Sequence, residues 1–65
     1  MKSESTYEMA CVFKLETEAA ILITDPASGE DIWIPFSQVE EIHRAPDGTG
    51  TIVMTSWIAR QKGLL

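Results

Sequence analysis

Cysteine and histidine are scarce in this sequence. Its 65 residues include one cysteine, Cys11, and one histidine, His43. A single cysteine excludes a disulfide within these residues, and it favours a reducing compartment because small secreted domains usually depend on disulfides. One cysteine and one histidine also fall short of the ligand cluster that a structural zinc site needs. The sequence therefore predicts neither a disulfide scaffold nor a metal site.

Basic residues are also few. Ten Asp and Glu residues against five Lys and Arg residues give a net charge of −5. Nonspecific binding to nucleic acid depends on Lys and Arg side chains that neutralise phosphates, so the long-range field of this chain repels a polyanion. An acidic surface favours solubility and protein partners instead.

Long apolar runs are missing as well. No uninterrupted run is longer than that at residues 19–23, which is far short of the roughly 20 residues that cross a bilayer. The first six residues are polar and lack the apolar core of a signal peptide. We therefore expect a cytoplasmic location and no membrane partner.

The short length limits the size of the core. A chain of this length buries only about 60% of the surface that its unfolded form exposes. Apolar burial and lost chain entropy nearly cancel at such a size, so good packing or self-association must supply the remaining stability. Hydrophobic residues make up 45% of the chain, as in ordinary globular proteins. We expect residues 1–6 to form a flexible tail and residues 7–65 to form one small β-barrel domain.

The sequence does contain a succession of short β-strand patterns. Residues 7–15 alternate and predict a strand with one face in the core. The side chains expected on that face are Tyr7, Met9, Cys11, Phe13 and Leu15. Residues 19–24 are apolar on both faces, as in a central strand. Residues 30–34 form a third strand that Pro35 ends, because proline lacks an amide donor. These three strands are expected to form a meander.

Turn residues separate the strands. Residues 25–29 combine Pro, Ser and Gly, and residues 45–50 contain Pro-Asp-Gly, in which Pro presets φ and Gly accepts a positive φ. Between these turns, Ser37 is expected to cap a single 3₁₀ turn before a short polar strand at residues 40–44. A last strand covers residues 51–55.

The final segment is helical in character. Ser56 is a suitable N-cap, residues 57–62 supply fewer than two turns, and Gly63 fits the position just after the helix. So short a helix is unstable alone and must dock an apolar side chain on the sheet. The candidates for that contact are Trp57, Ile58 and Leu64. We therefore predict a mainly β fold, which is a small five-stranded antiparallel, partly open barrel (SH3-like, with OB-like as the alternative) and a short C-terminal helix.

Catalysis is not predicted. Cys11 lies on the apolar face of the first strand, where burial raises the pKa of a thiol and makes it less reactive. A catalytic pair would need Cys11 and His43 to meet, and nothing in their spacing indicates that they do. The acidic pairs lack the spacing of a calcium loop and are typical of solvated strand ends. We expect a non-enzymatic protein without a cofactor.

Aromatic residues supply the candidate binding site. If Ile32 and Ile34 face the core, Trp33 points to the opposite face of the sheet. An exposed Trp is a strong candidate for a contact residue, because Trp dominates the hot spots of protein interfaces. The alternative interpretation places Trp33 under the C-terminal helix, against Trp57 or Leu64. The predicted partner-binding residues are Trp33 and Phe36, with Glu30, Asp31, Glu40 and Glu41 setting the choice of partner.

Two segments carry a resemblance. A Trp-Ile-Pro-x-Ser-Gln run occupies residues 33–38, and a Trp-x-Ala-x-x-Lys-Gly-Leu pattern occupies residues 57–64. Together with the apolar strand and the Gly-containing turn before them, they resemble a group of short, mostly uncharacterised proteins encoded by phages, prophages and other mobile elements. The resemblance covers most of residues 13–64 and implies a bacterial cytoplasmic setting with a phage-related role. Such relatives often have a basic residue where this chain has Phe36, which enlarges the predicted apolar patch.

These features together predict a small acidic protein-interaction module. One concrete version is an inhibitor of a host DNA-binding or defence complex, such as an anti-CRISPR protein that mimics the charge of DNA. The alternative is a single-stranded nucleic-acid-binding barrel, whose aromatic side chains would stack on bases.

Overall fold

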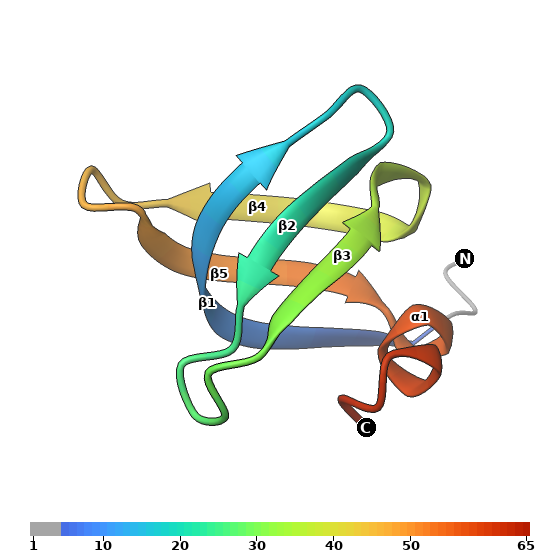
Figure 1. The fold of residues 1–65 in the computed structure, drawn as a ribbon. Coiled ribbons are helices and arrows are strands. Elements are labelled where there is room, and N and C mark those ends of the chain that lie inside the picture. Colours follow the sequence, from blue (N-terminus) through green and yellow to red (C-terminus); the bar gives the residue numbers. More distant parts are fainter. Residues whose placement is uncertain (1–4) are drawn as a thin grey trace.

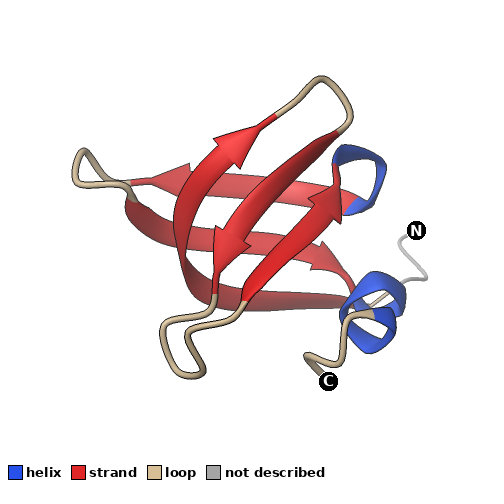
Figure 2. Cartoon of the chain, in the orientation of Figure 1, coloured by secondary structure: helices blue, strands red, loops and turns tan. Residues whose placement is uncertain are grey.

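The computed structural model describes residues 5–65, which form one curved antiparallel sheet of five strands with a short helix after the last strand (Figure 1). The elements are β1 (Thr6–Glu16), β2 (Ala20–Thr24), β3 (Asp31–Pro35), the 3₁₀ helix η1 (Phe36–Gln38), β4 (Val39–Arg44), β5 (Thr49–Thr55) and α1 (Ser56–Gln61). Strands make up the body of the molecule, and the helical turns lie at its margin (Figure 2). The sheet order is β3-β2-β1-β5-β4, so the sheet has two edges and does not close. The predicted mainly β, partly open barrel and its initial meander are confirmed.

Strand β1 belongs to both halves of the sheet. Residues 6–12 pair with β5, and residues 12–16 pair with β2. The strand curves between these two parts, so the two halves of the sheet wrap around one core (Figure 1). The register between β1 and β2 shifts between Phe13 and Leu15, and such a bulge increases the bend and twist of a strand.

This bulge corrects the prediction for Leu15. Simple alternation placed Leu15 in the core with Phe13, but its side chain is 62% exposed, whereas Phe13 packs against the core. Phe13 lies opposite the buried Ile23, and Leu15 lies opposite Leu22. The extra residue, Lys14, therefore moves the following side chain to the outer face of the sheet.

The core is almost entirely aliphatic. Its buried members are Cys11, Ile21, Ile23, Ile32, Ile34, Ile52, Met54, Ile58 and Ala59. Isoleucine suits this position because β-branched side chains pack well on a pleated surface. The prediction that Ile32 and Ile34 face inward is confirmed, and so is the burial of Cys11.

Both predicted turns contain a glycine with positive φ. Gly29 has φ 77° and its amide donates to the Asp25 carbonyl at 2.6 Å. Gly48 has φ 92° and its amide donates to the Ala45 carbonyl at 3.1 Å. A residue without a Cβ adopts this backbone conformation at no steric cost, as the sequence pattern predicted.

Helix α1 begins one residue earlier than predicted. Thr55, not Ser56, is the N-cap, and its hydroxyl accepts from the Ile58 amide at 3.3 Å. At the other end, the Leu64 amide donates to the Ala59 carbonyl at 2.8 Å across Gly63, whose φ is 75°. This is a Schellman ending, and it brings Leu64 against the core.

Two further boundaries differ from the prediction. The Ser56 amide donates to the Ser5 carbonyl at 3.1 Å and β1 already starts at Thr6, so these two residues belong to the domain. The rest of the predicted tail, residues 1–4, lies outside the described residues. Ser37 lies inside η1 and does not cap it, since Pro35 holds the N-cap position without a side-chain bond.

Within residues 5–65, no helix is long and apolar enough to cross a membrane.

Candidate protein-interaction surface

Trp33 lies on the outer face of the sheet. It sits between Ile32 and Ile34 on β3, and those two side chains fill the core. Alternation along the strand therefore turns the indole away from the core, and its side chain is 41% exposed. Helix α1 packs on β1 and β5, and the indole of Trp57 on this helix is 56% exposed. Neither indole is sealed in the interior.

Three apolar side chains share that outer face. In the sheet register, Trp33 of β3 lies opposite Leu22 of β2, and Leu22 lies opposite Leu15 of β1. Directly opposed residues on adjacent strands point to the same face and touch. We call this row of Leu15, Leu22 and Trp33 the outer stripe. Leu22 is half-buried, whereas Leu15 and Trp33 are exposed.

Sequence reasoning missed two members of the outer stripe. Leu22 could have been found, because residues 19–24 are apolar on both faces and must therefore present some apolar side chains outward. Leu15 could not, because the bulge that turns it outward depends on how β1 changes partner from β5 to β2.

Phe36 does not belong to the outer stripe. It begins η1, immediately after β3 ends, and its half-buried ring packs against the core. The sequence prediction placed Phe36 beside Trp33 in one contact patch. The structure assigns the two aromatic side chains to different surroundings, since one supports the core and the other is presented outward.

The predicted acidic neighbours lie in two separate groups. Glu30 and Asp31 are exposed at the start of β3, and the Asp31 carboxylate accepts from the Thr24 hydroxyl at 2.6 Å. Glu40 and Glu41 are exposed on β4, which forms the opposite edge of the sheet. Of these four residues, only Asp31 lies on the strand of Trp33, and Glu30 directly precedes it.

The chain segment that contains the outer stripe is acidic, although Lys14 and Arg44 line a pocket beside Leu15. From residue 15 to residue 43 the chain has no Lys or Arg, although this span contains β2 and β3 in full. It contains seven carboxylates, which are Glu16, Glu18, Asp25, Glu30, Asp31, Glu40 and Glu41. An apolar row within such a field is complementary to a partner that carries Lys or Arg around an apolar contact.

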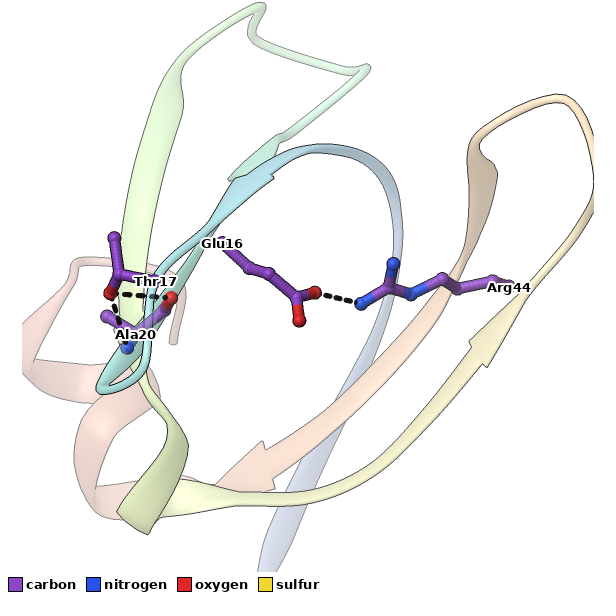
Figure 3. Close-up of polar contacts among 4 residues, drawn as sticks. All are labelled: Glu16, Thr17, Ala20 and Arg44. Carbon is purple, nitrogen blue, oxygen red and sulfur yellow. Dashed lines mark hydrogen bonds and ion pairs between the residues drawn. The ribbon is translucent and has the colours of Figure 1, made fainter.

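Arg44 is already occupied by partners from the same chain. Its guanidinium lies 5.0 Å from the centre of the Phe13 ring and forms an ion pair with Glu16 (Figure 3). In the adjoining turn, the Thr17 hydroxyl accepts from the Ala20 amide at 3.1 Å (Figure 3). Phe13, Glu16 and Arg44 line a pocket of about 230 Å³, together with Lys14, Leu15 and Ile21. Glu16 therefore competes with any anion for Arg44 at this pocket.

Gly50 makes the packing of Phe13 possible. A Cβ at residue 50 would lie 2.0 Å from the His43 carbonyl oxygen and 2.9 Å from the Phe13 ring. Any side chain at this position would therefore push apart β4 and β5. The glycine is required by close approach and not by an unusual φ.

Cys11 and His43, the candidate catalytic pair of the sequence analysis, do not meet. Cys11 is buried and opposes Gly50 on the inner face, whereas His43 is exposed and bonds Glu41 at 2.9 Å. Burial raises the pKa of the Cys11 thiol from 9.0 to about 11, and the charge of Arg44 partly opposes this shift. The thiol is therefore protonated and shielded near neutral pH.

No group of three or more potential metal ligands comes together among the residues that the structure describes. Comparison with protein-family models, with curated protein sequences and with solved structures found no match to this chain. The outer stripe therefore stands on its own geometry as the candidate site.

Proposed function

We propose that this chain is a non-enzymatic protein-interaction module that binds a basic protein surface through the outer stripe. The observation that carries the proposal is the row of Leu15, Leu22 and Trp33 across three adjacent strands. Two of these three side chains are among the exposed large hydrophobic residues of the molecule. A large, rigid indole at the end of such a row has the character of an interface hot spot.

The charge around the outer stripe defines the partner. Proteins that bind nucleic acid present Lys and Arg side chains to phosphates, and the acidic span from residue 15 to residue 43 has the opposite charge. A phage or mobile-element protein of this kind would inhibit a host DNA-binding or defence complex by occupying its nucleic-acid surface. The apolar contact supplies affinity, and the carboxylates supply attraction and orientation.

Affinity capture with outer-stripe variants tests the proposal. The purified chain is immobilised and exposed to a bacterial lysate, and retained proteins are identified and then titrated in pure form. Trp33→Ala is expected to weaken binding of the specific partner by about 2 kcal/mol, which is the scale of a hot-spot residue. Leu15→Ser should weaken it as well, because Leu15 is the most exposed member of the outer stripe.

Trp57→Ala is the matched control. Trp57 is also an exposed indole, but it lies on α1 and not on the outer stripe. The proposal requires that this variant binds as the wild type does. It is overturned if the Leu15 and Trp33 variants bind as tightly as the wild type, or if the Trp57 variant loses binding equally. Circular dichroism confirms that each variant is folded.

A further inference from the structure

Strand β3 forms an open edge of the sheet, and its hydrogen-bonding pattern can be derived from its neighbours. The Asp25 amide donates to the Glu30 carbonyl at 2.9 Å, and the Phe36 amide donates to the Ala19 carbonyl at 2.8 Å. These two bonds lie at the two ends of the β2–β3 ladder and continue its residue pairing. Because main-chain groups alternate in an antiparallel pair, residues 30, 32, 34 and 36 turn toward β2.

The odd residues of β3 therefore turn outward. Asp31 and Trp33 each present an amide and a carbonyl to the open edge, and Pro35 presents a carbonyl alone. Within the described part of the chain, no turn, loop or cap bond uses the main-chain groups of Asp31 and Trp33. The Pro35 carbonyl, at the N-cap of η1, accepts the first bond of that helix and has a second lone pair for another donor. Pro35 is tolerated here because its missing amide faces away from the ladder.

The two edges of the sheet differ. The register of β4 with β5 shifts between Val39 and Glu41, and β4 ends in the charged Arg44. Charge occurs at both edges, since β3 carries Asp31 and also Pro35, but a bulge, which protects an edge from pairing, is found in β4 and not in β3. The register of β3 with β2 runs without a shift over all five residues. A regular open strand is a template for the addition of another strand.

We propose that a second copy of this chain pairs with β3, edge to edge and antiparallel, about a two-fold axis at Trp33. In this register the two Trp33 residues exchange main-chain hydrogen bonds. The Asp31 amide of each copy donates to the Pro35 carbonyl of the other. The arrangement is isologous, as a two-fold interface must be.

Side chains select this register over its neighbours. Centring the axis on Asp31 would oppose two carboxylates, and centring it on Pro35 would oppose two residues without amides. Centring it on Trp33 places two indoles together and joins the outer stripes of both copies into one continuous row across six strands. The proposed partner surface then doubles in length, although the pairing itself does not depend on that partner.

The negative charges are compatible with this register. Asp31 of one copy lies opposite Pro35 of the other, so the two Asp31 residues are separated by four positions along the paired strands. At 3.4 Å per residue this is about 14 Å, which exceeds the screening length of about 8 Å at physiological ionic strength. Repulsion between Asp31 residues is therefore largely screened.

Removal of an outward-facing main-chain N–H group of β3 tests the proposal directly. Asp31→Pro removes an amide that faces the edge and leaves the β2 ladder intact, whereas Asp31→Ala removes the same carboxylate and keeps the amide. Sedimentation equilibrium of the full chain should show a monomer–dimer equilibrium. The dissociation constant should rise roughly tenfold or more for the proline variant, because two intermolecular hydrogen bonds are lost per dimer. It should not rise for the alanine variant.

Amide hydrogen exchange in the wild-type chain gives a readout that needs no variant. Protection of the Trp33 amide should increase with protein concentration, and protection of Ile42 on the β4 edge should not. A wild type that stays monomeric to millimolar concentration overturns the proposal. So does a folded proline variant that dimerises as tightly as the alanine variant, or a dimer that leaves the Trp33 amide unprotected.

Leu15→Ser separates this proposal from the proposed function. Leu15 lies on β1 in the outer stripe, two strands away from the β3 edge. Loss of partner binding in this variant with an unchanged dimer supports both proposals. Loss of the dimer in Asp31→Pro, with partner binding equal to that of Asp31→Ala, supports the edge pairing and leaves the proposed function standing.

Discussion

The surroundings of a side chain in this protein, more than its chemical type, decide whether it can react or bind. Cys11 has the atom of a nucleophile, yet it is 2% exposed and lies among isoleucines. Arg44 has the charge of a phosphate ligand, yet it is paired with Glu16 and lies over Phe13. Trp33 and Leu15, by contrast, are large apolar side chains at open positions on the sheet.

The buried thiol predicts a pH dependence of stability. Burial raises the pKa of Cys11 from 9.0 to about 11 in the folded chain. Above the unfolded pKa the unfolded chain loses this proton first, so the stability contribution is complete below pH 9 and is lost as pH rises toward 11. A shift of this size corresponds to about 2 to 3 kcal/mol. Urea unfolding of the wild type should therefore show a steeper loss of stability over this range than Cys11→Ala.

The difference in pH-dependent stability between the wild type and Cys11→Ala reports on the thiol alone, because all other titrating groups are common to both proteins. Equal slopes for the wild type and Cys11→Ala between pH 9 and pH 11 would contradict the prediction. The alanine variant is expected to be less stable near pH 7, because it leaves a small cavity in the core.

At the scale of elements, the junction between β5 and α1 holds the helix in place. The Thr55 hydroxyl accepts from the Ile58 amide at 3.3 Å and donates to the Gln38 side-chain oxygen at 2.7 Å. The Thr55 side chain therefore caps the N-terminus of α1 and links this helix to η1. A helix of six residues depends on such contacts because it is too short to be stable alone.

Substitution of Thr55 tests this role. Thr55→Val keeps the shape of the side chain and removes the hydroxyl, so it should lower the free energy of unfolding by about 1 to 2 kcal/mol. Thr55→Ser keeps the hydroxyl and should cost less than half as much. Chemical denaturation measures both. Equal losses for the two variants would show that the methyl group, and not the hydroxyl, is what matters.

The helices and strands also show which structural features can be predicted from local sequence patterns. Alternation, turn residues and the glycine after the helix predicted five strands, two turns and the Schellman ending, since each depends on neighbours in the chain. The bulge at Lys14 depends instead on where β1 changes partner. For this reason the sequence assigned Leu15 to the wrong face. Phe36 lies in η1 and packs against the core, away from the patch predicted beside Trp33, and the exposure of Trp33 agrees with simple alternation, one of the two interpretations that the sequence allowed.

The whole molecule carries a net charge of −5, and this charge acts in opposite directions on the two proposed associations. Two copies of one acidic chain repel each other at long range, whereas a basic partner is attracted. Added salt screens both effects, since the screening length falls from about 30 Å at 0.01 M to about 8 Å at 0.15 M.

The two associations should therefore respond to salt with opposite sign. Between 0.01 M and 0.15 M NaCl, self-association through β3 should become tighter, because main-chain hydrogen bonds and indole contacts remain while repulsion fades. Binding of the basic partner should become weaker over the same range, chiefly through a slower association rate. Sedimentation equilibrium measures the first, and surface-immobilised binding kinetics measure the second. A dimer that dissociates on addition of salt would mean that opposite charges hold the copies together, which edge pairing at β3 does not provide.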